Sequence, residues 1–119
     1  MGRKSLFHGK RAEDIANQYL IHEGFIILDR NWSCKYGELD VVAAKQGRLY
    51  FFEVKYRENA NFGYPFEYIN QAKLKRLLIT IELYLCSKNL LKVSWNLDGL
   101  CLFHGNGTLY LRWFRDILV

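Results

Sequence analysis

The chain has 119 residues and a net charge of +5 at neutral pH, and half of its residues are hydrophobic. This length suits one domain and leaves no room for two, so we expect residues 1–119 to form a single domain. The composition excludes a disordered tail, and the lack of a run of about 20 apolar residues excludes a membrane-spanning helix. The basic balance favours a polyanionic partner such as nucleic acid, although a basic protein without such a partner fits the charge equally well.

The cysteines indicate a reducing environment. Cys34, Cys86 and Cys101 are odd in number and widely spaced, and they form no Cys-x-x-Cys pair. Such a set is neither a disulfide framework nor a zinc site. The first residues also lack the apolar run of a signal peptide, so we expect a cytoplasmic protein.

The first part of the chain predicts a helix and then a strand. Residues 10–23 place apolar side chains at three- and four-residue spacing, and Gly24 follows as a helix stop. Residues 25–28 are short, apolar and β-prone, which is typical of a buried strand. A polar connection is expected from there to Gly37.

The middle of the chain predicts a β-hairpin and a long loop. Residues 38–44 and 49–56 are the two expected strands, and residues 45–48 are the glycine-containing loop between them. The polar segment 57–66 holds the single proline and must be a loop. Its length in so small a domain indicates a functional role, such as closing over a substrate.

The last part of the chain predicts a helix over 67–87 and then two strands, one over 93–97 that continues over 101–104 and a last one over 109–114. We expect a kink at Gly99 within the first of these strands. The order is therefore helix, three strands, helix, two strands, which is typical of an α/β fold in which helices cover a mixed sheet.

The position of the hairpin loop predicts which charged residues face each other on the two strands. If residues 45–48 form the loop, the numbers of facing residues add up to a constant along the two strands. Asp40 then faces Glu53, and Glu38 faces Lys55. Directly opposed residues of an antiparallel pair point to the same side of the sheet, so these four side chains are expected to form one group.

Two interpretations of this group remain open. Half-buried carboxylates that repel each other need a cation, and oxygen ligands suit Mg²⁺ or Mn²⁺. In that case Lys55 offsets charge or contacts a phosphate. In the alternative, Lys55 forms a salt bridge with Glu38 or Glu53 and no metal is involved.

Residues on the two helices and the long loop extend the candidate site. Glu13 lies at the border of the first helix's apolar stripe, where it could reach the end of the sheet as a further acid. Gln71 lies at the edge of the second helix's stripe, with Lys73, Lys75 and Arg76 around it, and Arg57 begins the loop. We take Lys73, Gln71, Arg57 and Arg76 as candidate nucleic-acid contacts, although such a run of charge is more often a solvated surface.

Several of these residues belong to a recognisable pattern. It comprises Glu13, "GELD" at 37–40, "FFEVKYR" at 51–57, Lys73 and "WFRDIL" at 113–118. The pattern resembles the YraN-like family of uncharacterised bacterial proteins over nearly the whole chain. That family in turn looks like archaeal Holliday-junction resolvases and other PD-(D/E)xK nucleases.

The resemblance implies a restriction-endonuclease-like fold and a metal-dependent endonuclease that uses Mg²⁺ or Mn²⁺. It implies that Asp40 and Glu53 bind the metal and that Lys55 is the catalytic lysine, while Glu13 is an acid carried by the helix and Lys73 is an auxiliary basic residue. One departure is visible, because the family usually has Arg-Phe-Asp in the strand after the second helix, whereas this chain has Ser-Trp-Asn at 94–96.

The leading hypothesis is therefore hydrolysis of phosphodiester bonds in DNA. A second hypothesis is a nuclease fold that binds nucleic acid without cutting it, and a third is a protein-interaction subunit whose carboxylates only form salt bridges. The sequence leaves open whether the substrate is a junction, a flap, a single strand or RNA. A homodimer is implied only by analogy with resolvases.

Overall fold

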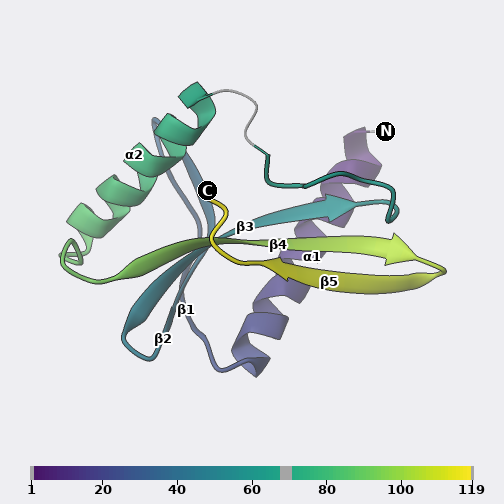
Figure 1. Ribbon diagram of the computed structural model, residues 1–119, viewed down its shortest axis with the longest axis horizontal. Helices are drawn as coiled ribbons and strands as arrows, with labels where there is room; N and C mark the ends of the chain where they lie inside the picture. Colours follow the sequence, from purple (N-terminus) through teal and green to yellow (C-terminus); the bar gives the residue numbers. More distant parts are fainter. Residues whose placement is uncertain (1, 68–70, 119) are drawn as a thin grey trace.

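A five-stranded sheet with one helix on each face forms the fold (Figure 1). The computed structural model describes residues 2–67 and 71–118, and for residues 2–9 it describes the backbone only. The elements in chain order are α1 (Gly2–His22), β1 (Ile26–Cys34), β2 (Gly37–Lys45), β3 (Arg48–Arg57), α2 (Gln71–Ser87), β4 (Trp95–Gly105) and β5 (Thr108–Phe114). The predicted order of elements is confirmed, and so is the α/β class, with a mixed sheet compatible with the restriction-endonuclease-like fold.

The strands lie in their chain order, from β1 to β5. All neighbours are antiparallel except β3 and β4, which are parallel and are connected through α2. The hairpin register is the predicted one, with Ala44 opposite Leu49. The turn itself is shorter than expected, because it consists of Gln46 and Gly47, both with positive φ, and such two-residue turns match the twist of a hairpin.

Alternating side chains of the strands build two apolar layers. Phe51 packs with α2 on one face, whereas its neighbour Phe52 packs with α1 on the other. The layer under α2 includes Leu39, Val42, Phe51, Leu77, Ile81, Tyr84 and Leu97. The layer under α1 includes Ala12, Ala16, Leu20, Val41, Phe52 and Leu100. A central strand apolar on both faces is therefore covered on both faces, as its composition requires.

The first strand is longer than predicted. The segment 29–34, expected to be a connection, continues β1 and pairs with β2 as far as Cys34 and Gly37. β1 is an edge strand whose side chains alternate between exposed and half-buried, so polar residues are tolerated in it. Trp32 anchors it by packing edge-on against Tyr84 of α2.

The predicted kink at Gly99 is wrong, because β4 runs unbroken through this residue. Gly99 pairs with Glu53 of β3, and the ring of Phe66 lies directly on it, so a Cβ atom here would be 2.4 Å from that ring. The glycine thus makes room for the long loop to return over the sheet. The loop ends with Pro65 and Phe66 buried, so this part of it belongs to the core.

The helices differ from the prediction mainly at their starts. α1 begins before residue 10. The predicted start of the second helix includes residues 68–70, which lie outside the described residues. Among the described residues, no helix is long and apolar enough to cross a membrane.

Candidate functional site

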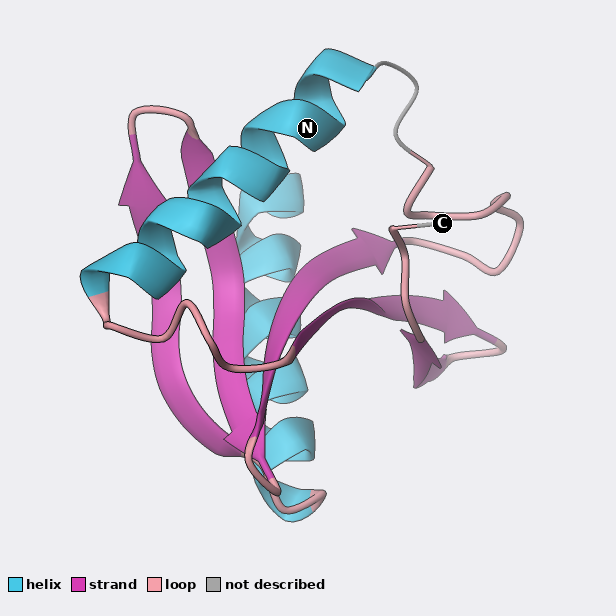
Figure 2. Ribbon diagram, turned by 60° about the vertical axis from the view of Figure 1, so that its left-hand side comes forward, coloured by secondary structure: helices cyan, strands magenta, loops and turns pink. Residues whose placement is uncertain are grey.

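The candidate site lies where the sheet divides. The β2–β3 ladder ends at the pair Val41–Phe52, and β3 then continues alongside β4 alone. The strands separate visibly beyond this point, as the β1–β2 hairpin goes one way and β3 bends toward β4 and β5 (Figure 2). Asp40 is the first residue of β2 beyond the ladder, and its Oδ2 accepts a hydrogen bond of 2.8 Å from the backbone N–H of Val54.

The carboxyl groups of Asp40 and Glu53 lie close enough together for each to act strongly on the other. Burial of Glu53 and the nearby Asp40 charge raise the pKa of Glu53 to about 9, against a weaker opposing effect of Lys55. At neutral pH Glu53 therefore keeps its proton in the folded protein without a bound metal. The adjacency of Asp40 and Glu53 expected from the hairpin register is present in the structure.

This pair is a donor set that fits a hard divalent cation. Two carboxylates that repel each other are relieved by a cation as well as by a proton, and Mg²⁺ is commonly held by one or two carboxylates together with water and phosphate oxygens. Within the described residues, no three His, Cys, Asp or Glu side chains are grouped to hold a metal on their own. An ion on Asp40 and Glu53 would therefore take its other ligands from water and substrate.

Two further carboxylates surround the pair. Burial and, less strongly, the charge of Asp40 raise the pKa of Glu13, so this acid of α1 does reach the end of the sheet. The amide of Asn31, oriented with its nitrogen toward the acids, donates to Oε1 of Glu13 and Oε1 of Glu38, each at 3.0 Å. Asn31, on β1, thus ties α1 to β2 beside the site.

A cleft of about 330 Å³ opens between this end of the sheet and α2. Its lining residues are Tyr36, Gly37, Glu38, Glu53, Lys55, Lys73, Arg76 and Leu77. The structure therefore brings Lys73 and Arg76 to the same cleft as Glu53 and Lys55. Among the described residues, the lining does not include Gln71, Arg57, Glu13 or Asp40.

Lys55 does not form the salt bridge that the alternative interpretation requires. The ion pairs among the described residues are His22–Glu23, Arg30–Asp14 and Lys88–Asp29. Lys55 is half-buried and lies close enough to Glu53 to favour its ionised form, yet it makes no ion pair with a described carboxylate.

Sequence reasoning missed Tyr36, which lines the cleft from the turn between β1 and β2. It also missed the reason for the adjacent glycine. A Cβ at Gly37 would lie 3.1 Å from Oγ1 of Thr80, so α2 packs tightly against this turn. The motif Gly-Glu-Leu-Asp at 37–40 had already marked the glycine as a residue of interest. Nothing in the sequence marked Tyr36, because this segment was expected to be an irregular connection.

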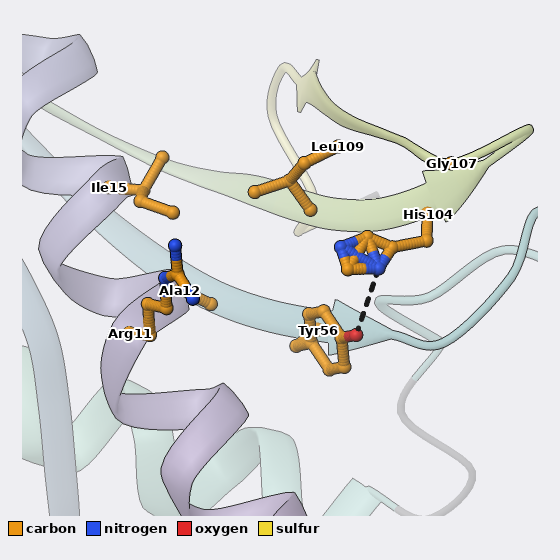
Figure 3. A pocket seen from close by; sticks show the side chains of 7 residues that line it. All are labelled: Arg11, Ala12, Ile15, Tyr56, His104, Gly107 and Leu109. Atoms are coloured by element: carbon orange, nitrogen blue, oxygen red, sulfur yellow. Dashed lines mark hydrogen bonds between the residues drawn. The ribbon is translucent and has the colours of Figure 1, made fainter.

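A second hollow lies on the opposite face of the sheet (Figure 3). It measures about 190 Å³, and Tyr56 and His104 line it together with Arg11 of α1. The hydroxyl of Tyr56 lies 3.4 Å from Nδ1 of His104. Since Tyr56 directly follows Lys55 in β3, the two side chains point to opposite faces, and this hollow is separate from the cleft.

The sequence profile of the uncharacterised protein family UPF0102 matches residues 12–101. The chain belongs to this family. The prediction from the YraN-like resemblance is thereby confirmed. A UPF0102 protein of a Nitratiruptor species is 39% identical over 83% of this chain and 85% of its own. A UPF0102 protein of Neisseria meningitidis serogroup C is 36% identical over 92% of this chain and 92% of its own. A UPF0102 protein of Clostridium tetani is 37% identical over 82% of this chain and 80% of its own.

The UPF0102 segment includes all of the candidate catalytic residues and the Ser-Trp-Asn departure. Asn96 is held by Arg48, which donates to its Oδ1. The acidic residue of this strand is Asp98, which is fully buried and accepts hydrogen bonds from Nε1 of Trp113 at 2.9 Å and from the N–H of Asp116 at 2.8 Å. Asp98 therefore fastens β5 and the turn after it, so its role in this UPF0102 chain is structural.

Proposed function

We propose that this UPF0102 protein is a Mg²⁺- or Mn²⁺-dependent nuclease that hydrolyses phosphodiester bonds in DNA. The observation that carries the proposal is the proximity of the Asp40 and Glu53 carboxyl groups at the point where β2 and β3 separate. Lys55 follows two residues later in β3, and Lys73 and Arg76 of α2 line the same cleft. The site therefore combines two acids that can bind a cation, an amine that can act on the reacting phosphate, and two basic side chains that can bind the DNA backbone.

Asp40 and Glu53 are the residues that would hold the cation. When bound, such an ion polarises a phosphate and lowers the pKa of a bound water. The N–H of Val54 fixes the orientation of the Asp40 carboxylate, and Glu53 is half-buried beside Gly99, its neighbour on β4. Glu13, held by Asn31, would bind the ion's outer water molecules.

The basic residues act on the phosphate. The ammonium group of Lys55, with no carboxylate partner among the described residues, would orient the attacking water or offset the negative charge that develops on the phosphate. Lys73 and Arg76 would hold the backbone of the bound strand, where the guanidinium can contact two phosphate oxygens at once. Arg57 and Gln71 do not line the cleft and would contact flanking phosphates.

Cleavage of labelled single-stranded, duplex and branched DNA with Mg²⁺ or Mn²⁺ tests the proposal. Glu53→Gln preserves the size of the side chain and should abolish cutting, while circular dichroism shows an unchanged fold. Glu82→Gln alters an exposed glutamate of α2 and should cut like the wild type. Full activity of the Glu53 variant would refute the assignment, and wild-type protein that binds DNA but cuts none of these substrates would favour a binding module instead.

A further inference from the structure

Tyr36 occupies a prominent place beside the cleft. Together with Lys35 it forms the turn between β1 and β2, and its side chain is 37% exposed. It lines the cleft that holds Glu53 and also an adjoining hollow of about 440 Å³ that extends along α2. The two spaces share Tyr36 and Arg76 as lining residues, so they lie side by side, and we call them together the trough.

The outer part of this trough is basic. Its lining residues are Lys35, Tyr36, Ala72, Lys75, Arg76 and Ile79, so it carries three cations and no acid. None of the three cations takes part in an ion pair with the described residues. Such a lining attracts a phosphate backbone and would guide it past the tyrosine.

The ring of Tyr36 lacks the packing that other exposed tyrosines have. Tyr110 stacks on Phe103 with ring centroids 5.6 Å apart, and Tyr64 packs edge-on against Phe114 at 5.6 Å. Among the described residues, the only ring interaction of Tyr36 is with the ammonium group of Lys35, 5.2 Å from the ring centroid. An aromatic ring among cations is the arrangement on which nucleobases stack in proteins that bind single strands.

We propose that Tyr36, Lys35, Lys75 and Arg76 form a flank subsite that binds an unpaired nucleotide next to the cleaved phosphodiester. A continuous duplex keeps the faces of its bases covered by their neighbours, so only an unpaired base can stack on Tyr36. The preferred substrate is therefore DNA with unpaired nucleotides at the cut, either a single strand or the boundary between single and double strands. The cleavage part of this inference rests on the proposed nuclease function, whereas the binding part does not.

Binding measurements on the full chain test the flank subsite without cleavage. Fluorescence anisotropy in EDTA gives the Kd for a single-stranded oligonucleotide and for the matched duplex. Stacking on an aromatic side chain contributes about 1–3 kcal/mol per base, so Tyr36→Ala should weaken single-strand binding roughly 5- to 150-fold. The Kd for the duplex should change less than twofold in Tyr36→Ala. Tyr36→Trp, which keeps an aromatic ring, should bind the single strand like the wild type.

Two controls separate stacking from charge and from general damage. Tyr110→Ala removes a tyrosine that is 46% exposed on β5, far along the chain from the trough, and should leave both Kd values unchanged. Lys75→Ala should weaken binding of single strand and duplex alike and reduce the salt dependence. A 2-aminopurine placed in the single strand should be quenched by the wild type and not by the Tyr36→Ala protein.

The outcomes distinguish this inference from the proposed function. Equal effects of Tyr36→Ala on single strand and duplex, or no effect on either, would overturn the flank subsite even if the wild type cuts DNA. Selective loss of single-strand binding in a protein that cuts nothing would establish the subsite and refute the nuclease proposal.

Discussion

Replacing Glu53 with Gln should remove a pH dependence of stability that the metal-free wild type possesses. The pKa of Glu53 is raised from its ordinary 4.5 to about 9 by burial and by Asp40. Between these values the folded protein keeps a proton that the unfolded chain releases. The free energy of unfolding must therefore fall as pH rises through this window, and the contribution is complete only below about pH 4.5.

The size of the effect follows from one proton. A difference of one bound proton changes the free energy of unfolding by about 1.4 kcal/mol per pH unit. From pH 6 to pH 8 the wild type should lose up to about 2.7 kcal/mol relative to the variant, or on the order of 10 °C in Tm for a domain of this size. The proton belongs to the Asp40–Glu53 pair, so Asp40→Asn should reduce the slope as well.

Urea denaturation in EDTA between pH 6 and 8.5 measures this difference. The wild type should lose stability relative to Glu53→Gln as pH rises, whereas the exposed-site control Glu82→Gln should follow the wild type. Added Mg²⁺ should stabilise the wild type more at pH 8 than at pH 6, because the ion must displace the proton. A constant difference between the wild type and Glu53→Gln across the whole range would show that Glu53 is ionised in the folded protein and would refute this reasoning.

Three further variants probe the site and its support. Lys55→Met should lower the rate of single-turnover cleavage by roughly 10²- to 10³-fold, with circular dichroism unchanged, because it removes the charge that the proposed mechanism places at the reacting phosphate. A loss below tenfold would remove Lys55 from the mechanism. Gly99→Ala should cost about 1–3 kcal/mol in urea denaturation, since its Cβ would overlap the Phe66 ring, and Phe66→Leu should recover part of that loss. Asp98→Ala should cost about 1–3 kcal/mol and alter the fluorescence of Trp113, because it removes the buried carboxylate that accepts from the indole N–H of Trp113 and the backbone N–H of Asp116.

The sequence contains enough information to place Asp40 beside Glu53, and the reason is local. A short turn with positive φ at both residues fixes the hairpin register as far as the pair Val41–Phe52, and Asp40 and Glu53 are the next residue of each strand, so they still lie side by side. The same arithmetic fails for Glu38 and Lys55, because the ladder ends at Val41 and no such pair forms. Where the ladder ends depends on β4, which the local pattern of the hairpin does not contain.

Other parts of the site depend on tertiary contacts that no local pattern encodes. The segment 29–34 has the polar composition of a loop, and it becomes a strand only because an edge position leaves one side of it in water. Asn31 gains its role from Glu13, eighteen residues earlier, and from Glu38 across the turn. Tyr36 lines the cleft because α2 packs against the turn that carries it.

The separation of β2 from β3 explains why acidic residues are tolerated at this point. Beyond the pair Val41–Phe52 the backbone N–H of Val54 has no ladder partner on β2, and the carboxylate of Asp40 takes that place at 2.8 Å. A side chain that satisfies a backbone donor is held rigidly, and it is held against Glu53, which is unfavourable unless a proton or a cation lies between them. Asp40→Ala should therefore destabilise the region where β2 and β3 separate, and it should lower the pKa of Glu53. Asp40→Asn should retain the hydrogen bond from the N–H of Val54. Equal urea midpoints for the Asp40→Ala and wild-type proteins would show that the hydrogen bond from Val54 to Asp40 does not stabilise this end of the sheet.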